Sequence, residues 1–379
     1  KEYMGSRPLL STGTVNIDIP LYEINYKGLD IPFSVTYRTN GIKVGDDPYP
    51  CGYGWIFNPG LRVTRTIMGR PDELFKWEIP ATSDICNFEY QKSFIREDQY
   101  PNERDLLRDG EPDIFTINLP DESCTFVIDQ RKGGFEPITI NTNLKIELDI
   151  TPYKQINEIK VTDGDGFIYH FTNKYTECLD VFSDYVTAWM LESITCPDGD
   201  SITFNWGGYN HSGFNWNEYN PFSLRDFANY ENKDGSGAEI PDEKDSSMTG
   251  DYSYNGRHKD LQHLESVDFP GGSLHFFYEI KNYGPWLTKM EVRDFNSTII
   301  KKAEFTYPAD SSGALLRKLV ISDEGAYTFD YYQEVRYDAN NGNARDYWGY
   351  YNGKTGNKSL VPIINFKKQT SYADYGYFE

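Results

Sequence analysis

One phrase recurs five times between residues 156 and 332 and limits what this chain can fold into. Each copy has a short run of alternating apolar and polar residues, a turn that is acidic or contains glycine, and a second run that ends in aromatic residues. Side chains two apart in a strand share a face, and such turns reverse the chain tightly, so each copy predicts a β-hairpin. The copies are INEIKVTDGDGFIYHF (156–171), LESITCPDGDSITFNW (191–206), LESVDFPGGSLHFFY (264–278), LTKMEVRDFNSTIIKKAEFTY (287–307) and LRKLVISDEGAYTFDYY (316–332).

The turns carry the residues that tight hairpins demand, because glycine, and less often aspartate, adopts the positive φ that other residues avoid. These residues are therefore expected to build turns and not to catalyse. They are Asp163, Gly166, Asp198, Gly199, Gly271, Gly272, Asp323 and Gly325. A looser sixth copy spans residues 117–129.

In the second copy the alternation identifies one face that should be buried. Leu191, Ile194, Ile202 and Phe204 fall on that face if the strand kinks at Ser193. The fold class predicted from all copies is all-β: hairpin repeats in a large, curved, mostly antiparallel sheet, preceded by a further β-rich portion.

Composition excludes several classes of partner. The formal charge of −21 argues against nucleic acid and against anionic membrane surfaces, which both require basic clusters. No apolar run approaches the roughly 18 residues of a membrane-spanning helix, so no membrane insertion is expected. The chain begins at Lys1 and not at Met, which favours removal of an export signal or trimming of the chain. We therefore expect an exported protein that is secreted or displayed on the cell surface.

The sequence divides into four predicted parts. Residues 1–73 form an N-terminal β segment, and residues 74–116 form a long polar connection. Residues 117–332 hold the hairpin repeats, with an aromatic and acidic insertion at 207–260. Residues 333–379 are rich in Tyr and Gly and look like the start of a further segment that has been cut short.

Candidate metal and catalytic groups are weak. The five cysteines are scattered and favour buried apolar positions over a disulfide framework, although a Cys178–Cys196 bridge stays open. His258 and His263 are five residues apart, whereas a helical zinc pair needs four. We predict no catalytic residue, no metal and no cofactor.

Aromatic residues flanked by Asn and Asp suit glycan recognition, because sugar faces stack on rings and polar side chains bind hydroxyls. The alternative is that these rings fill gaps between hairpin layers. The candidate residues for a glycan or protein partner are Trp206, Tyr209, Trp216, Tyr219, Trp348, Tyr350 and Tyr351.

Three stretches carry a family resemblance. Residues 11–73, which include STGTVNIDIPLY and CGYGWIFNPGLRVTRTIMGRPDE, resemble the start of exported Rhs or YD-repeat proteins of Bacteroidetes, and are similar to SpvB-like B components of toxin complexes. TAWMLESITCPDGDSITFNW (187–206) and RDYWGYYNGK (345–354) resemble recurrent phrases of the same proteins. The resemblance implies a hollow β-shell that, in characterised relatives, encloses a C-terminal toxin. Only Tyr337-Asp338 comes near the strict Tyr-Asp repeat element.

The leading hypothesis is therefore a non-enzymatic, exported β-shell or scaffold segment. It would envelop or deliver a C-terminal part of its own longer chain, or interact with the cell surface. The alternative is a surface module that binds a glycan or a cell-surface protein through exposed aromatic residues. A carbohydrate-active hydrolase is the third hypothesis. A carboxylate pair alone does not support it, because with 58 carboxylates some pair falls at glycosidase distance by chance.

Overall fold

The fold is given by a computed structural model, in which the described residues form strands, turns and loops and no helix. The structure describes residues 15–39, 41, 50–58, 61–68, 72, 76–77, 108–109, 112–120, 122–129, 134–139, 142–152, 155–180, 183–217, 253–281, 284–308, 315–331 and 350–351. In this part of the chain, no helix has the length and apolar character needed to cross a membrane.

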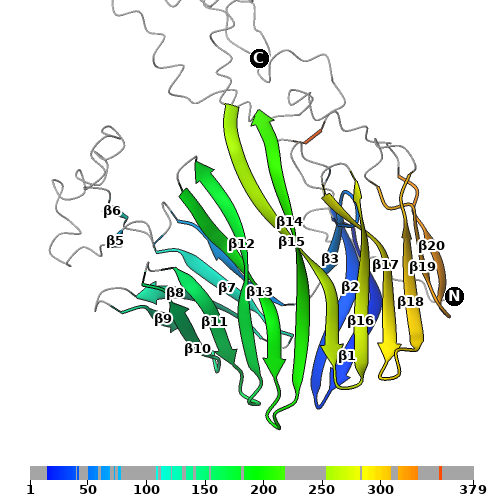
Figure 1. Cartoon of the computed structure of the whole chain (residues 1–379), viewed down its shortest axis with the longest axis horizontal. Helices are drawn as coiled ribbons and strands as arrows, with labels where there is room; N and C mark the ends of the chain where they lie inside the picture. Colours follow the sequence, from blue (N-terminus) through cyan, green and yellow to red (C-terminus); the bar gives the residue numbers. More distant parts are fainter. Residues whose placement is uncertain are drawn as a thin grey trace, which may run out of the picture. The chain divides into compact units, whose positions relative to one another are not determined.

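The strands, in chain order, belong to three sheets (Figure 1). β1 (Val15–Tyr26), β2 (Leu29–Thr39) and β3 (Trp55–Asn58) form an antiparallel sheet of three strands. β5 (Lys76–Trp77) and β6 (Arg108–Asp109) form a short parallel pair. The third sheet has 15 strands. They are β4 (Arg62–Thr66), β7 (Ile114–Asn118), β8 (Ser123–Asp129), β9 (Glu136–Thr139), β10 (Lys145–Ile150), β11 (Ile156–Thr162), β12 (Ile168–Asp180), β13 (Ser183–Thr195), β14 (Ser201–Asn217), β15 (Ser253–Phe269), β16 (Gly272–Lys281), β17 (Gly284–Asp294), β18 (Ile299–Thr306), β19 (Lys318–Ile321) and β20 (Gly325–Thr328).

All five predicted hairpins are present as antiparallel strand pairs: β11–β12, β13–β14, β15–β16, β17–β18 and β19–β20. The looser sixth copy is the β7–β8 hairpin. From β13 to β20 the sheet follows chain order, so each hairpin adds beside the one before it. The predicted all-β class and its large antiparallel sheet are confirmed.

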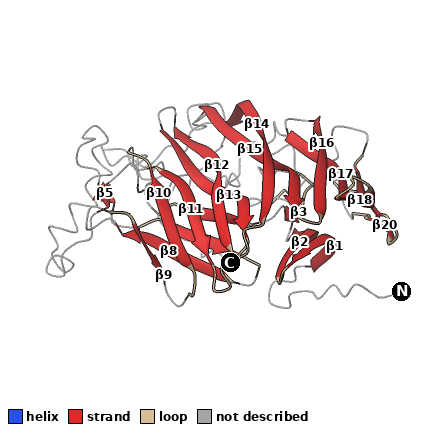
Figure 2. Cartoon of the chain, turned by 60° about the horizontal axis from the view of Figure 1, so that its bottom comes forward, coloured by secondary structure: helices blue, strands red, loops and turns tan. Residues whose placement is uncertain are grey.

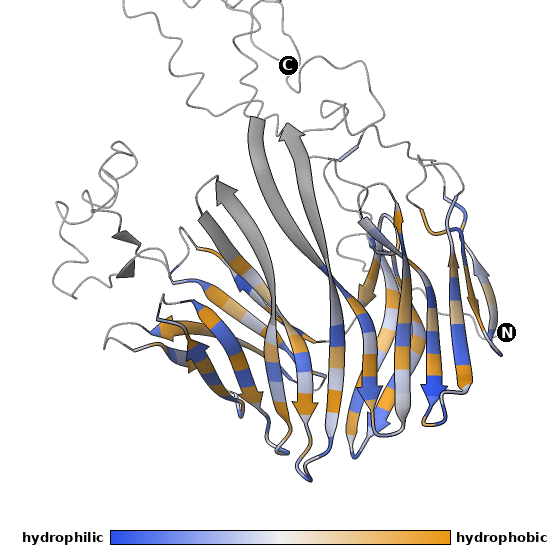
Figure 3. Ribbon diagram, viewed as in Figure 1, coloured by the Kyte–Doolittle hydropathy of each residue, from blue (hydrophilic) through white to orange (hydrophobic). Residues whose placement is uncertain are grey.

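The alternation read from the second hairpin also holds. Leu191, Ile194 and Ile202 are fully buried and Phe204 is nearly so. The register between β12 and β13 shifts beside Ser193, which lets Leu191 and Ile194 share a face although they are three residues apart. Figure 3 shows the same alternation of hydrophobic and hydrophilic residues along most strands of the sheet.

The large sheet forks at β13. One edge of β13 pairs with β12 along its length, whereas the other edge is divided between two strands. Ser193–Thr195 pairs with the start of β14, and Ala188–Met190 pairs with β4 from the N-terminal segment. The β4–β7–β8–β9 branch and β14 therefore follow the same edge of β13 within one sheet (Figure 2).

The β4–β7–β8–β9 branch contributes aromatic side chains to the core. The ring of Phe115 on β7 stacks on Phe126 of β8 with 4.9 Å between centroids, and it contacts Trp189 of β13 at 5.8 Å. The indole N–H of Trp189 donates to the Ile156 carbonyl oxygen on β11 at 3.3 Å. One tryptophan thus joins the β4–β9 branch to the β10–β12 strands.

The three-stranded sheet packs on the β15–β20 part of the large sheet through aromatic side chains. Phe276 on β16 contacts Phe33 of β2 at 5.9 Å and Phe57 of β3 at 5.3 Å between ring centroids. Trp55 of β3 contacts Phe329, which follows β20, at 4.6 Å. The buried residues of these contacts and those of the β4–β7–β8–β9 branch form one continuous core.

Residue contacts divide the chain into two compact units. The first comprises Lys1–Asn40, Asp47–Asn215 and Asn255–Glu334, and holds all the packing described above. The second comprises Gly41–Asp46, Trp216–Tyr254 and Val335–Glu379.

The cysteines that can be placed are buried, free thiols. They are Cys51, Cys124 and Cys196. Because the Cys196 thiol is free, the Cys178–Cys196 disulfide left open by the sequence is not formed. Burial raises the pKa of the Cys196 thiol, which keeps it in the protonated, unreactive form.

Candidate functional site

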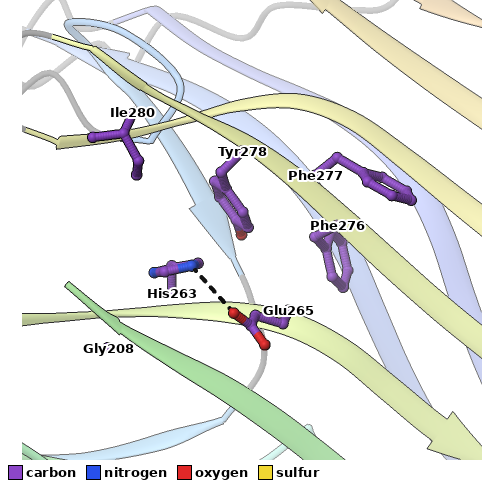
Figure 4. Close-up of a pocket in the computed structure, with 7 residues that line it drawn as sticks. All are labelled: Gly208, His263, Glu265, Phe276, Phe277, Tyr278 and Ile280. Atoms are coloured by element: carbon purple, nitrogen blue, oxygen red, sulfur yellow. Dashed lines mark ion pairs between the residues drawn. The ribbon is translucent and has the colours of Figure 1, made fainter.

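The candidate site is an open groove of about 570 Å³ where β14, β15 and β16 lie side by side (Figure 4). A volume of this size falls within the range of small-molecule sites in proteins. The lining combines one imidazole and one carboxylate with several apolar side chains. Its residues are Gly208, His263, Glu265, Phe276, Phe277, Tyr278 and Ile280.

Strand geometry places the polar pair. His263 and Glu265 are two residues apart on β15, so both project to the same side while Leu264 between them is fully buried. The neighbouring strand β16 contributes the aromatic side. The Tyr278 hydroxyl donates a hydrogen bond to the Leu264 carbonyl oxygen at 2.9 Å, which fixes the ring over β15.

The imidazole of His263 lies between the Tyr278 ring and the Glu265 carboxylate, as Figure 4 shows. Its ring meets Tyr278 edge-on with centroids 4.7 Å apart, and its Nε2 lies 3.7 Å from Glu265 Oε1. The Nδ1 atom is buried without a hydrogen-bond partner among the described residues. Burial lowers the pKa of His263 below its ordinary value, although Glu265 acts in the opposite direction. The neutral ring therefore dominates at pH 7.

Gly207 on β14 lies directly against this pair, so a side chain at that position would displace the Glu265 carboxylate or the imidazole. A Cβ there would lie 2.8 Å from His263 Nε2 and closer still to the Glu265 carboxylate. Glycine within a strand often marks such a close approach. The sequence signal was the Gly207-Gly208 pair directly after Trp206, which our sequence analysis did not use.

The groove can bind polar groups, but it has no arrangement that holds a metal. Across the residues that the structure describes, no group of three or more His, Cys, Asp or Glu side chains is placed to bind a metal ion. The side chain of His258, considered with His263 as a zinc pair, lies outside the described residues.

The aromatic residues predicted to bind a partner have different positions. The Trp206 indole N–H donates to the Leu191 carbonyl oxygen at 2.8 Å, and its half-buried ring packs on the core. Tyr209 and Trp216 belong to β14, but their side chains lie outside the described residues, as do Tyr219 and Trp348 altogether.

The last two of these aromatic residues belong to the second unit. Tyr350 and Tyr351 are half buried. A Cβ on Gly41 would lie 3.0 Å from Tyr350 Cδ1, so the Tyr350 ring covers that glycine. Whether any of the seven aromatic residues binds a glycan or a protein stays a prediction.

The acidic turn residues make hydrogen bonds to the backbone. Asp163 Oδ1 accepts from the backbone N–H groups of Asp165 and Phe167 at 3.0 and 2.9 Å, and Asp198 Oδ1 accepts from Asp200 N–H at 3.3 Å. The turn glycines with positive φ are Gly166 (90°), Gly199 (95°), Gly272 (153°) and Gly325 (116°), and Asp323 has a φ of 66°. Gly271 lies in the β15–β16 turn without a positive φ.

A buried ion pair escaped the sequence analysis. Arg65 of β4 binds Asp113 with side chains that are 2% and 0% exposed, and Arg65 Nε lies 2.7 Å from Asp113 Oδ2. Asp113 also accepts from the backbone N–H groups of Met68 and Asp72 at 2.9 and 3.1 Å. The two residues are 48 positions apart, so no local pattern connects them.

Comparison with known proteins gives structural similarity without sequence similarity. No protein-family model matches the chain, and no curated protein matches it. The crystal structure of TcdB2-TccC3 is similar with a TM-score of 0.41 and 10% identity, over 84% of this chain and 16% of that chain. This chain thus spans about a sixth of that protein.

The N-terminal domain of effector protein SpvB from Salmonella typhimurium strain LT2 is similar with a TM-score of 0.41 and 12% identity, over 83% of this chain and 98% of that one. SpvB is also named in the resemblance that the sequence carries. The Bacteroidetes YD-repeat type stays a prediction. A TM-score of 0.41 is too low to transfer an activity or the role of a residue.

Proposed function

We propose that the chain is a non-enzymatic scaffold: a wall of β-hairpins that envelops or delivers a C-terminal part of its own longer chain, or that interacts with a cell surface. The order of strands from β13 to β20 carries the proposal. Each hairpin pairs with the one before it, so the wall can grow by adding hairpins without rearranging what is already built.

The use of polar groups supports the same proposal. In the turns, Asp163, Asp198 and Asp294 accept backbone N–H groups, which is a structural role. The buried Arg65–Asp113 pair binds backbone as well. These charges stabilise the wall and do not converge on a substrate position.

Export is part of the proposal, and it rests on the sequence resemblance to exported proteins. Fractionation of the native bacterium, with an antibody against the chain, tests it. We expect the protein in the medium or in a form that protease reaches on intact cells. Recovery only from the cytoplasm, protected from protease until lysis, would contradict export.

Limited proteolysis of the full-length gene product tests envelopment. If the wall encloses a C-terminal segment, that segment should resist protease in the intact protein and be digested when expressed alone. An Asp113→Ala variant should lose the protection, because the wall loses its buried ion pair. The control is Glu304→Gln, whose side chain is 52% exposed on β18. Digestion at equal rates in the intact protein and in the isolated segment would overturn the envelope.

A further inference from the structure

The groove between β14 and β16 has two polar side chains, His263 and Glu265, beside apolar surface. Ile280 is 50% exposed and lies at one end of the groove, and Phe277 lies toward the other end (Figure 4). The Glu265 side chain is 58% exposed, so its oxygens face solvent and are accessible to a ligand. The groove is therefore accessible to a ligand that has both polar and apolar sides.

The hydrogen-bonding capacity of the groove defines the ligand. A neutral imidazole has one N–H donor and one acceptor nitrogen, whereas a carboxylate only accepts. His263 Nε2 and Glu265 Oε1 are 3.7 Å apart, too far for a direct hydrogen bond. A ligand group that both donates and accepts can bridge the two side chains, and a hydroxyl does so.

Charge excludes the other common classes of ligand. The Glu265 carboxylate and the net charge of −21 disfavour phosphates, sulfates and acidic peptides. An ammonium group would satisfy Glu265, but it only donates hydrogen bonds and could not accept one from an Nε2–H of His263. An uncharged ligand rich in hydroxyls fits both side chains.

The apolar lining fits the same ligand. Pyranose rings present C–H faces that pack on aromatic and aliphatic side chains. Tyr278 and Ile280, two residues apart on β16, offer such surface on one face of that strand. We propose that this groove binds a neutral carbohydrate, with Glu265 and His263 binding hydroxyls and β16 supplying the apolar wall.

The proposed activity is binding without cleavage. Hydrolysis of a glycosidic bond uses a pair of carboxyl groups on opposite sides of the bond. Among the residues that line the groove, only Glu265 carries a carboxylate. Among the residues that the structure describes, the lining of the groove includes none of the seven predicted aromatic residues.

Isothermal titration of the 379-residue chain tests the proposal. The probes are glucose, galactose, mannose and N-acetylglucosamine with their β1,4-linked disaccharides, sialyllactose as an anionic comparison, and a mixed hexapeptide library. We expect binding of at least one neutral sugar. No heat from any neutral sugar at millimolar concentration, or a preference for sialyllactose or for peptides, would overturn the proposal.

Variants locate the binding. Glu265→Gln keeps the shape but removes the charge, and should weaken binding by about tenfold or more, because hydrogen bonds to charged groups are the stronger ones. Ile280→Ser tests the apolar wall and should weaken binding severalfold. Glu304→Gln, an equally conservative change on β18 outside the groove, should leave binding unchanged. All three side chains are exposed, so the variants should unfold at the temperature of the parent chain. Binding unaltered by both groove variants would overturn the assignment.

Discussion

Two of the attachments between the N-terminal segment and the large sheet use opposite physical means. β4 joins the sheet itself, and its Arg65 pairs with Asp113 where water is excluded. The tip of the β1–β2 hairpin instead meets the β13–β14 turn in solvent, where Tyr26 and Lys27 bind Asp200 and Lys27 also binds Asp198. The Lys27 and Asp200 side chains are 45% and 50% exposed.

The difference teaches where this fold depends on charge. Removing one partner of a buried pair leaves the other charge without water, whereas exposed partners return to solvent at little cost. The stabilisation from the buried Arg65–Asp113 pair should therefore not depend on salt, and removal of either partner should destabilise the fold. The exposed attachment should respond to salt and pH while the aromatic contacts of β3 keep the smaller sheet in place.

The largest effect is expected at the buried attachment. Asp113→Ala leaves the Arg65 guanidinium buried without its carboxylate, and should lower the free energy of unfolding by about 3–5 kcal/mol. Urea denaturation measures the loss as a lower midpoint. The double variant Arg65→Met/Asp113→Leu removes both charges and should be the milder of the two. A loss below about 1 kcal/mol in Asp113→Ala would show that the pair is not a buried anchor.

A smaller effect is expected at the aromatic contact of β3. Trp55 Nε1 donates to the Tyr331 hydroxyl at 2.8 Å, and that hydroxyl donates in turn to the Leu316 carbonyl oxygen at 2.7 Å. Trp55→Phe keeps a ring against Phe329 and removes one hydrogen bond, so the free energy of unfolding should fall by about 1 kcal/mol. Tyr331→Phe removes both bonds and should cost more in the same urea measurement. Equal losses would contradict this chain of hydrogen bonds.

The exposed attachment should show a still smaller effect. Lys27→Met removes its ion pairs with Asp198 and Asp200, and should lower stability at low salt by less than Trp55→Phe does. At about 1 M salt the Debye length is about 3 Å, so the difference between variant and parent should vanish. The loss in Asp113→Ala should persist at that salt concentration. A loss of stability in Lys27→Met that does not change with salt would contradict the difference between the exposed and the buried attachment.

The smallest effect is expected from acid. The hydrogen bond from Tyr26, and then that from Lys27, hold the pKa of Asp200 below its ordinary value of 3.8. Since the native pKa is lowered, this stabilisation is complete above the ordinary value and is lost as the pH falls through the native pKa. Amide exchange at Lys27 and Gly28 should therefore be unchanged from pH 7 to 5, after correction for intrinsic rates, and accelerate only in stronger acid. Asp200→Asn should abolish that acid step.

The hairpins could be predicted from sequence because the two strands of each hairpin and the turn between them are adjacent in the chain. Asp198-Gly199 follows one alternating run and precedes another, so turn and strands are read together, and the burial of Ile194 and Ile202 follows from the alternation. The same local logic explains why the turn carboxylates were interpreted as structural.

The fork at β13 and the groove could not be predicted in this way. Ala188 pairs with Thr64, 124 positions earlier by subtraction of the two numbers, and no short pattern encodes that choice. His263 was considered only with His258, because spacing along one strand says nothing of Tyr278 on the next. The Gly207-Gly208 pair was a usable signal for close approach, but it does not say which side chains approach.

The divided edge of β13 imposes an order of events during synthesis. β4 leaves the ribosome early and pairs with β7 after about 50 further residues, yet its other edge has no partner until the Ala188–Met190 stretch appears. At about 5–20 residues per second, those 124 residues take on the order of 6–25 s. During that interval one edge of β4 is unpaired on the nascent chain and can pair with a strand of another chain. Aggregation is therefore most probable at this stage of synthesis.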